Sequence, residues 1–275
     1  MTNSPTTKNS RQNVLITGAT SGIGLATAQR LARYGYRVFG TGRSVSSMEQ
    51  DEIEYLRLEV TSNDSVAACV EQVRARTGGE LDVLINNVGT GILGAAEESS
   101  VEQVQQLFDV NFFGAVRMTN ATLPMMRQRR QGCIVMISSA GGIASVPFAA
   151  YYCATKHALE AYSETLRIEL EPFQIQVVTV APGTVGTDAG DKAMKPDRQL
   201  AEYEAVRTKT TDAYNQSIHQ GMSPDIVAMT IQKILSTQKP RSRYTVGAQS
   251  TAVSAIKRWL PYGIVEAGTR KMVRR

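Results

Sequence analysis

The sequence has few of the residues that build disulfides and metal sites. Its 275 residues include three cysteines and two histidines. Cys69, Cys133 and Cys153 lie within apolar patterns and lack Cys-x-x-Cys spacing, so we expect buried thiols in a reducing compartment, the cytoplasm. With only His157 and His219 available, we expect no metal site.

Long apolar runs and a strong net charge are also missing. No segment approaches the roughly 18 to 20 apolar residues of a membrane span. Residues 1 to 12 are polar, lack the apolar centre of a signal peptide and are expected to be disordered. The net charge is +5, and neither a recognition helix nor a stacking platform is evident, so we expect no nucleic-acid partner.

Buried strand patterns alternate with amphipathic helix patterns along most of the chain. The alternation predicts an α/β fold, a single doubly wound, Rossmann-type parallel sheet of about seven strands with helices on both faces. We expect strands at residues 13–17, 36–41, 55–59, 81–86, 132–138, 175–181 and 243–247. We expect helices near 22–34, 64–76, 100–129, 150–171 and 224–236, with a looser helical pattern over 188–218. The predicted units are the N-terminal segment 1–12, the main domain 13–248 and a basic helical extension 249–275.

A glycine-rich turn follows the first predicted strand and precedes the first predicted helix. Glycines at 18, 22 and 24 allow a tight turn and a close approach to a ligand, and the start of a helix offers free N–H groups to a phosphate. The spacing Gly-x-x-x-Gly-x-Gly only approximates the common dinucleotide fingerprint, so a purely structural turn is the alternative.

Tyr152 and Lys156 are four residues apart, which places a phenol and an ammonium on one helix face. Ser139 lies thirteen positions before Tyr152, after an apolar run. This arrangement favours proton transfer to a carbonyl oxygen. A solvated helix face is the alternative when the tyrosine and lysine are considered alone.

Together with these motifs, Asn86-Asn87-Val88-Gly89 follows another buried strand, and Pro182-Gly183 follows a later one. From about residue 11 to about residue 187 the chain resembles the short-chain dehydrogenase/reductase family, with five of the family's signals in the correct order. The resemblance implies a catalytic tetrad of Asn111, Ser139, Tyr152 and Lys156. It implies cofactor contacts from Gly18, Thr20, Ser21, Gly22, Ile23, Gly24, Arg43, Glu59, Val60, Asn87, Val88, Gly89, Tyr152, Lys156, Pro182, Gly183, Val185 and Thr187.

In this interpretation Tyr152 is the general acid for reduction and the base for oxidation. A free tyrosine has a pKa of about 10, and we expect Lys156 together with the oxidised nicotinamide to favour the phenolate. Ser139 is expected to hydrogen-bond the substrate oxygen. By the resemblance, Lys156 also holds the nicotinamide ribose, and Asn111 positions a water molecule.

The cofactor is expected to be NADP(H) rather than NAD(H). The end of the second predicted strand carries no acidic residue to bind a ribose 2′-hydroxyl, whereas Arg43 offers a planar donor fork for a 2′-phosphate. Two residues depart from the family pattern. Val88 replaces the usual alanine, and Glu59 stands where an aspartate usually contacts adenine.

The substrate is expected to be a lipophilic ketone, aldehyde or alcohol. Gly141, Ile143, Val146 and Phe148 are expected to line an apolar pocket, and the insert at 183–222 is long enough to form a lid. The alternatives are a reductase of acyl-chain or sugar-like carbonyls and a non-catalytic NADP(H)-binding redox sensor.

Two further contacts follow from the distribution of apolar and basic residues. By the resemblance, helices 100–129 and 150–171 form a homodimer or homotetramer interface; the alternative is that one sheet face absorbs their apolar residues. The C-terminal extension combines Trp259 and Leu260 with many basic residues. Such a segment usually forms a solvated surface. Weak contact with an anionic membrane surface is the alternative.

Overall fold

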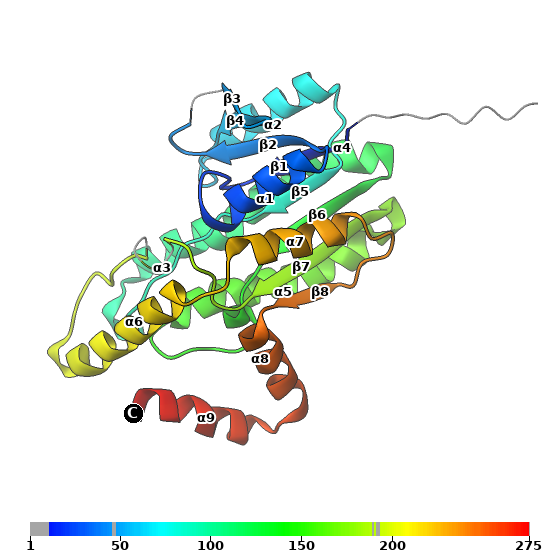
Figure 1. Cartoon of the computed structure of the whole chain (residues 1–275). Coiled ribbons are helices and arrows are strands. Elements are labelled where there is room, and N and C mark those ends of the chain that lie inside the picture. Colours follow the sequence, from blue (N-terminus) through cyan, green and yellow to red (C-terminus); the bar gives the residue numbers. More distant parts are fainter. Residues whose placement is uncertain (1–10, 46–47, 189, 191–192, 275) are drawn as a thin grey trace, which may run out of the picture.

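The computed structural model describes residues 11–45, 48–188, 190 and 193–274, so residues 1–10 of the predicted disordered segment lie outside the described residues. One eight-stranded sheet has the order β3-β4-β2-β1-β5-β6-β7-β8 (Figure 1). Its strands are β1 (Asn13–Ile16), β2 (Arg37–Gly42), β3 (Met48–Gln50), β4 (Ile53–Arg57), β5 (Val83–Asn86), β6 (Gly132–Ile137), β7 (Ile175–Pro182) and β8 (Arg243–Val246).

Seven of these strands run parallel, as predicted, and β3 is an additional antiparallel edge strand beside β4. The three-residue β3 is too short to produce a visible alternation, which is why the sequence does not reveal it.

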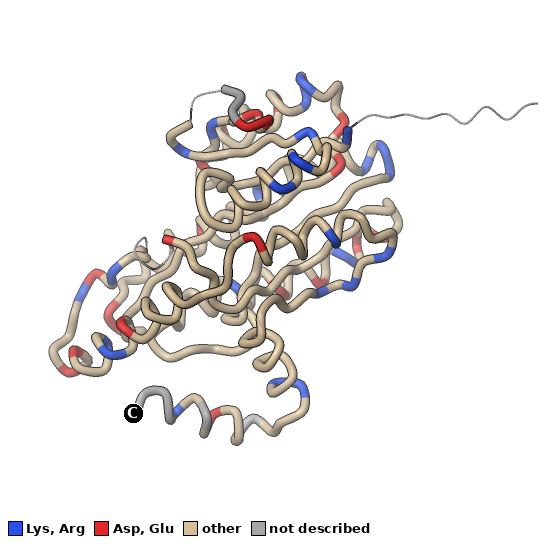
Figure 2. The backbone as a smooth tube through the Cα atoms, in the orientation of Figure 1, with Lys and Arg blue, Asp and Glu red and all other residues tan. Residues whose placement is uncertain are grey.

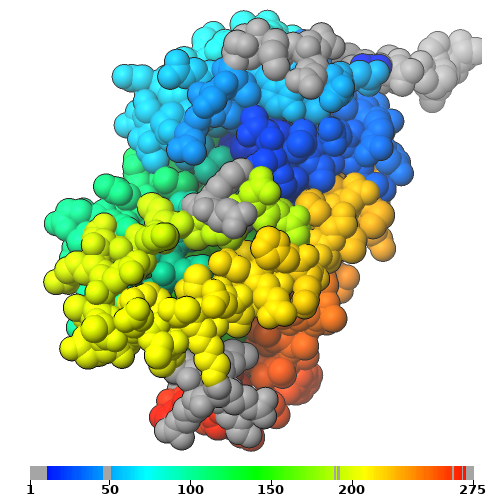
Figure 3. Space-filling view, turned by 60° about the vertical axis from the view of Figure 1, so that its left-hand side comes forward, coloured from blue at the N-terminus to red at the C-terminus, as the bar shows by residue number. Residues whose placement is uncertain are grey.

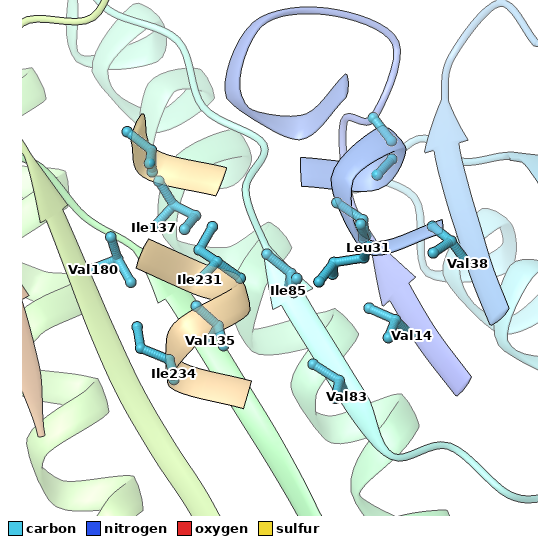
Figure 4. Packing of buried hydrophobic residues seen from close by; sticks show 14 of the residues in the cluster. Val14, Leu31, Val38, Val83, Ile85, Val135, Ile137, Val180, Ile231 and Ile234 are labelled. Carbon is cyan, nitrogen blue, oxygen red and sulfur yellow. The ribbon is translucent and has the colours of Figure 1, made fainter. Parts of the chain in front are cut away.

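Helices cover both faces of the sheet. One face carries α1 (Gly22–Arg33) and α7 (Pro224–Leu235), and the other carries α2 (Asn63–Thr77), α4 (Gly114–Arg129) and α5 (Ala150–Leu170). Successive strand residues point to opposite faces, so Val14 and Ile16 join the first core while Leu15 joins the second. Figure 4 shows the first core, in which Leu31 of α1 and Ile231 of α7 pack on strand valines and isoleucines.

The predicted helix 100–129 is divided into three parts. A regular helix α3 (Val101–Phe108) leads into a π-helical turn, Asp109–Phe113, and then into α4. A π-turn inserts one extra residue and rotates the side chains that follow, and such turns are frequent at functional sites. Asn111 lies in the middle of this turn.

The chain order places a topological switch point between β1 and β5. From β1 the chain proceeds to β2 and β4 on one side, and from β5 to β6, β7 and β8 on the other. Loops that leave the carboxyl ends of β1 and β5 therefore diverge and leave a crevice, which is the usual ligand site of such sheets.

The segment 183–222 crosses this end of the sheet. It contains a short turn of 3-10 helix (Ala201–Tyr203) and α6 (Glu204–His219), with residues 189, 191 and 192 outside the described part. Single β-bridges join Val185 to Met222 at its base and Met194 to Ile92 at its far side. In Figure 3 the yellow residues of this segment extend across the front of the molecule.

The C-terminal extension forms two helices, α8 (Ala248–Trp259) and α9 (Tyr262–Arg274). They project from the edge of the sheet below β8, and α9 turns back beneath α6 (Figure 1). Among the described residues, no helix combines the length and apolar character needed to span a bilayer.

Candidate active site

The glycine-rich turn between β1 and α1 has the backbone shape that the sequence predicts. Gly18 and Gly22 have φ angles of +68° and +55°, values that side chains disfavour. A Cβ on Gly24 would lie only 2.0 Å from the Gly18 carbonyl oxygen, so only glycine fits there. The Asn87 amide holds the turn by donating to the carbonyl oxygens of Thr17 and Gly18, at 2.9 and 3.0 Å.

A cleft of about 640 Å³ begins at this turn and extends to Tyr152. The start of α1 faces it; Ser21 makes no side-chain cap, and no acidic residue occupies the first helical turn. The free N–H groups and the helix dipole therefore suit an anionic group such as a diphosphate. The predicted cofactor residues that line the cleft are Gly18, Thr20, Ser21, Gly22, Ile23, Arg43, Glu59, Val60, Asn87, Val88, Gly89, Tyr152, Lys156 and Thr187.

Four predicted cofactor residues do not line this cleft. Gly24 lies in the first turn of α1, Pro182 is the last residue of β7, and Gly183 and Val185 follow it. Gly183 donates its N–H to Val246, and the Gln249 side chain covers it. Thr187 and Asp188 of this loop line the cleft, and Thr187 lies against Gly22.

Ser139 and Tyr152 meet at the inner end of the cleft. Ser139 follows β6 and begins a short 3-10 turn, whereas Tyr152 lies in the first turn of α5. The Ser139 side chain is close enough to Tyr152 to lower the pKa of the phenol, and its hydroxyl oxygen accepts from the Gly141 N–H at 3.1 Å. Gly141 leaves space for the phenol ring, since a Cβ there would be 3.1 Å from a ring carbon.

The electrostatic environment of Tyr152 differs from the expectation. Burial raises the pKa of Tyr152 above its ordinary value, the neighbouring Tyr214 raises it further, and the Ser139 side chain lowers it. Lys156 Nζ lies 6.0 Å from the ring centroid and donates to the carbonyl oxygen of Ile137 at 2.9 Å. In the protein alone the phenol is thus kept protonated, because desolvation outweighs the distant cation.

Lys156 is buried beneath Gly89. Desolvation lowers the pKa of Lys156 to about 8, and the Glu160 carboxylate opposes this shift. Glu160 is one turn later on α5 and is paired with Arg243 at 2.7 Å. The ammonium therefore remains largely protonated at neutral pH.

Asn111 reaches the same place from the π-helical turn. Its amide donates to the Thr90 carbonyl oxygen and to the Thr155 hydroxyl, at 2.9 and 3.0 Å, and its oxygen accepts from the Thr90 N–H at 2.8 Å. A Cβ on Gly89 would be 3.3 Å from Lys156 Nζ and 3.5 Å from the Asn111 oxygen, so Asn111 and Lys156 meet at Gly89. Of the predicted tetrad, Tyr152 and Lys156 line the cleft, whereas Ser139 and Asn111 do not.

Arg43 and Glu59 border the opposite end. The Arg43 side chain is exposed and makes no ion pair with any residue in the described part of the chain. One Glu59 carboxylate oxygen accepts from the Thr61 N–H and hydroxyl, at 3.2 and 3.0 Å. The Glu59 side chain is therefore bonded to the residue two positions later in the chain.

The cleft also contains residues that the sequence analysis did not identify. Gly91 and Leu93 come from the loop after β5, and Ala193, Met194 and Tyr214 from the lid segment. No motif fixes these positions, because the helical pattern over 188–218 is too loose to define which residues of α6 face inward. None of the predicted pocket residues Gly141, Ile143, Val146 and Phe148 lines this cleft. Phe148 has a φ of +63° and packs edge-on against Tyr203, with 6.3 Å between the ring centroids.

Comparisons with known proteins agree with this geometry. The sequence profile of the family described as short chain dehydrogenase matches residues 12–198. A 3-ketodihydrosphingosine reductase of Bacteroides thetaiotaomicron is 38% identical over 94% of this chain and 97% of its own. Retinol dehydrogenase 8 of Bos taurus is 36% identical over 92% of this chain and 86% of its own. A solved short-chain dehydrogenase from Streptomyces avermitilis superimposes with a TM-score of 0.82 at 32% identity, covering 97% of this chain and 96% of that one.

The family profile covers well over half of the chain, and the relatives match it along nearly its whole length. The parallel sheet, the glycine turn at its switch point and the tyrosine–lysine pair on α5 account for that match in structural terms. The chain therefore belongs to the short-chain dehydrogenase/reductase family of oxidoreductases.

Proposed function

We propose that this protein is an NADP(H)-dependent oxidoreductase that interconverts a lipophilic ketone or aldehyde and the corresponding alcohol. The observation that carries the proposal is that Tyr152, with Ser139 beside it, lies at the inner end of a cleft that begins at the glycine turn. The nicotinamide, when bound, supplies or accepts the hydride, and the protein must then deliver or remove a proton at the substrate oxygen.

Tyr152 is the proposed proton donor for reduction. Its raised pKa keeps the phenol protonated, which suits donation to an oxygen that gains negative charge. The Ser139 hydroxyl is the proposed second donor to that oxygen. For oxidation the phenolate is needed, and the buried Lys156 cation together with the charge of an oxidised nicotinamide is proposed to stabilise it.

The cofactor fit rests on this chain's own residues. Gly18, Gly22 and the start of α1 leave room and N–H groups for the diphosphate, and Lys156, which lines the same cleft, would hold the nicotinamide ribose. Arg43 favours NADP(H), because its guanidinium lines the cleft without an ion-pair partner among the described residues and suits a 2′-phosphate.

A lipophilic substrate is supported by the cleft and by the relatives. Leu93, Val110, Ala149 and Met194 contribute apolar surface beside Tyr152. The names of two relatives specify 3-ketodihydrosphingosine and retinol, and both compounds carry long hydrocarbon portions.

A homodimer or homotetramer is also proposed. Fewer apolar residues are available for its interface than the sequence analysis expected. Met118, Leu159, Leu166 and Leu170 are buried in the core beneath the sheet, so they are absorbed within one chain. Phe113 remains 47% exposed, with Phe112 and Tyr162 stacked behind it. An exposed phenylalanine supported by an aromatic cluster is typical of an oligomer interface.

The C-terminal helices are proposed to contact an anionic membrane surface. Ile256, Trp259, Leu260 and Ile264 are exposed. Lys257, Arg258 and Arg270 lie among them, and the blue segments of Figure 2 show these charges along the two helices. Apolar side chains beside basic ones complement lipid tails and anionic headgroups.

Turnover with the Tyr152→Phe variant tests the proposed chemistry. NADPH oxidation is measured with a panel of lipophilic ketones and aldehydes, and cofactor affinity by nicotinamide fluorescence. We expect wild-type turnover, a loss of about 100-fold or more in Tyr152→Phe, and cofactor affinity within a few-fold. Tyr151→Phe is the matched control, because Tyr151 donates to the Ala96 carbonyl oxygen and does not line the cleft.

Two results would contradict the proposal. Substantial activity in Tyr152→Phe would exclude the phenol as the proton donor. Tight NADPH binding by the wild type without turnover of any carbonyl compound would favour the redox sensor.

A further inference from the structure

We propose that Tyr214 binds a second polar group of the substrate, so that the preferred substrates are lipophilic carbonyl compounds with a hydroxyl or amino group near the reacting carbonyl. This inference rests on the proposed function, and it narrows the substrate from any lipophilic carbonyl compound to amphiphiles with a bifunctional head.

Tyr214 lies over the proposed reaction centre. It is on α6, in the lid segment, and lines the same cleft as Tyr152 and Lys156. It is close enough to affect the titration of Tyr152, and its own pKa is raised by burial. A group bound between the two phenols would therefore be near the carbonyl that Tyr152 serves.

The Tyr214 hydroxyl has no hydrogen-bond partner among the described residues, unlike two other tyrosines near the cleft. Tyr151 donates to the Ala96 carbonyl oxygen at 2.9 Å, and Tyr203 donates to Glu97 at 2.6 Å. Tyr214 is partly buried and lines the cleft, so its hydroxyl is available for a hydrogen bond to a ligand. A polar group of the substrate would supply the missing hydrogen bond.

The position of Tyr214 is fixed by the helix that carries it. Arg207 lies seven residues earlier, which places it two turns away on the same side of α6. Its guanidinium is paired with the fully buried Glu98 carboxylate. The pair ties α6 to the segment that carries Glu98, so the phenol cannot move far from the cleft without breaking it.

Apolar side chains also line the cleft that contains both phenols. Leu93, Ala149 and Met194 are three of them. The two phenols are therefore suited to the polar end of a substrate, and the apolar residues to the start of its hydrocarbon chain.

A matched pair of ketones tests the inference. The value of kcat/KM is measured with NADPH for 1-hydroxy-2-dodecanone and for 2-dodecanone, which differ only in the hydroxyl. We expect the wild type to prefer the hydroxyketone by about tenfold, the effect of one neutral hydrogen bond. In Tyr214→Phe the ratio is expected to fall to within about twofold of unity, whereas Tyr151→Phe keeps the wild-type ratio.

The outcomes separate the two proposals. A wild type that reduces both ketones equally, or a Tyr214→Phe variant that keeps the full preference, would overturn this inference and leave the proposed function intact. Absence of turnover with both ketones and with the whole carbonyl panel would overturn the proposed function itself.

Discussion

Arg43 is the residue on which the choice between the two nicotinamide cofactors depends. It lines the cleft and has no counter-ion in the described part of the chain, so its charge is available to a phosphate. Arg43→Ala is expected to lower kcat/KM for NADPH by about tenfold, with little change for NADH, because the 2′-phosphate loses a charge-assisted hydrogen bond while the 2′-hydroxyl does not.

The control for this measurement is Arg33→Ala, at the opposite end of α1, where the guanidinium donates to the Gln29 carbonyl oxygen. The ratio of the two kcat/KM values, obtained from initial rates, is the quantity to compare. An unchanged ratio in Arg43→Ala would remove the basis for NADP(H) preference.

At the residue scale, the sequence predicts what fixed spacing can specify. Tyr152 and Lys156 are one turn apart on a single helix, so no tertiary information is needed to bring them together. The direction of the Tyr152 pKa shift could not be predicted, because burial and the 6.0 Å distance to Lys156 depend on the surrounding packing. Tyr214 has no motif partner, and only the folded lid places it beside Tyr152.

At the scale of elements, hydrogen bonds join the lid to the segment 97–103. Ser100 and Gln103 have the spacing of a capping box, in which each side chain would accept the backbone N–H of the other residue. The structure shows only half of this arrangement. Ser100 does accept the Gln103 N–H, but the Gln103 side chain donates to the Lys195 carbonyl oxygen at 2.7 Å. The same residue types can cap a helix or hold a loop, and only the position of the lid decides between these roles.

Glu98 is the centre of these contacts. Its side chain is fully buried, accepts the N–H groups of Ala95 and Leu200 at 2.8 Å each, and pairs with Arg207. Three segments of the chain therefore converge on one carboxylate.

Glu98→Gln is expected to loosen the lid. The substitution leaves the Arg207 guanidinium, which is 11% exposed, without a counter-charge, and breaking a buried pair costs about 3 to 5 kcal/mol. We expect faster hydrogen exchange across α6 and a higher KM for the carbonyl substrate, with a smaller change in kcat. Glu97→Gln is the matched control, since Glu97 bonds the Tyr203 hydroxyl at an exposed site. Equal exchange of α6 in both variants would contradict a special role for Glu98.

At the scale of the whole molecule, the parallel sheet and its two helical layers follow from the alternation of strand and helix patterns. The placement of the C-terminal extension does not follow from the alternation of strand and helix patterns. Helices α8 and α9 are amphipathic in sequence, but nearly all of α8 apart from Ser250 is exposed. Periodicity indicates that a helix has an apolar face, and it cannot identify the partner that covers that face.

The proposed partner of this face is a bilayer with anionic headgroups, and vesicle sedimentation tests it. Trp259 is 76% exposed, and the Arg258 guanidinium lies 5.5 Å from its ring centroid, so the two side chains can enter the headgroup region together. We expect binding to phosphatidylserine-containing vesicles that weakens with salt and is several-fold weaker in Trp259→Ser, because interfacial apolar burial and about 1 kcal/mol per basic residue act jointly.

Tyr34→Ser, at an exposed site beyond α1, is the control and should bind like the wild type. If Trp259→Ser instead changes the mass measured by light scattering and leaves vesicle binding unaltered, the face joins two copies of the chain and the lipid proposal is wrong.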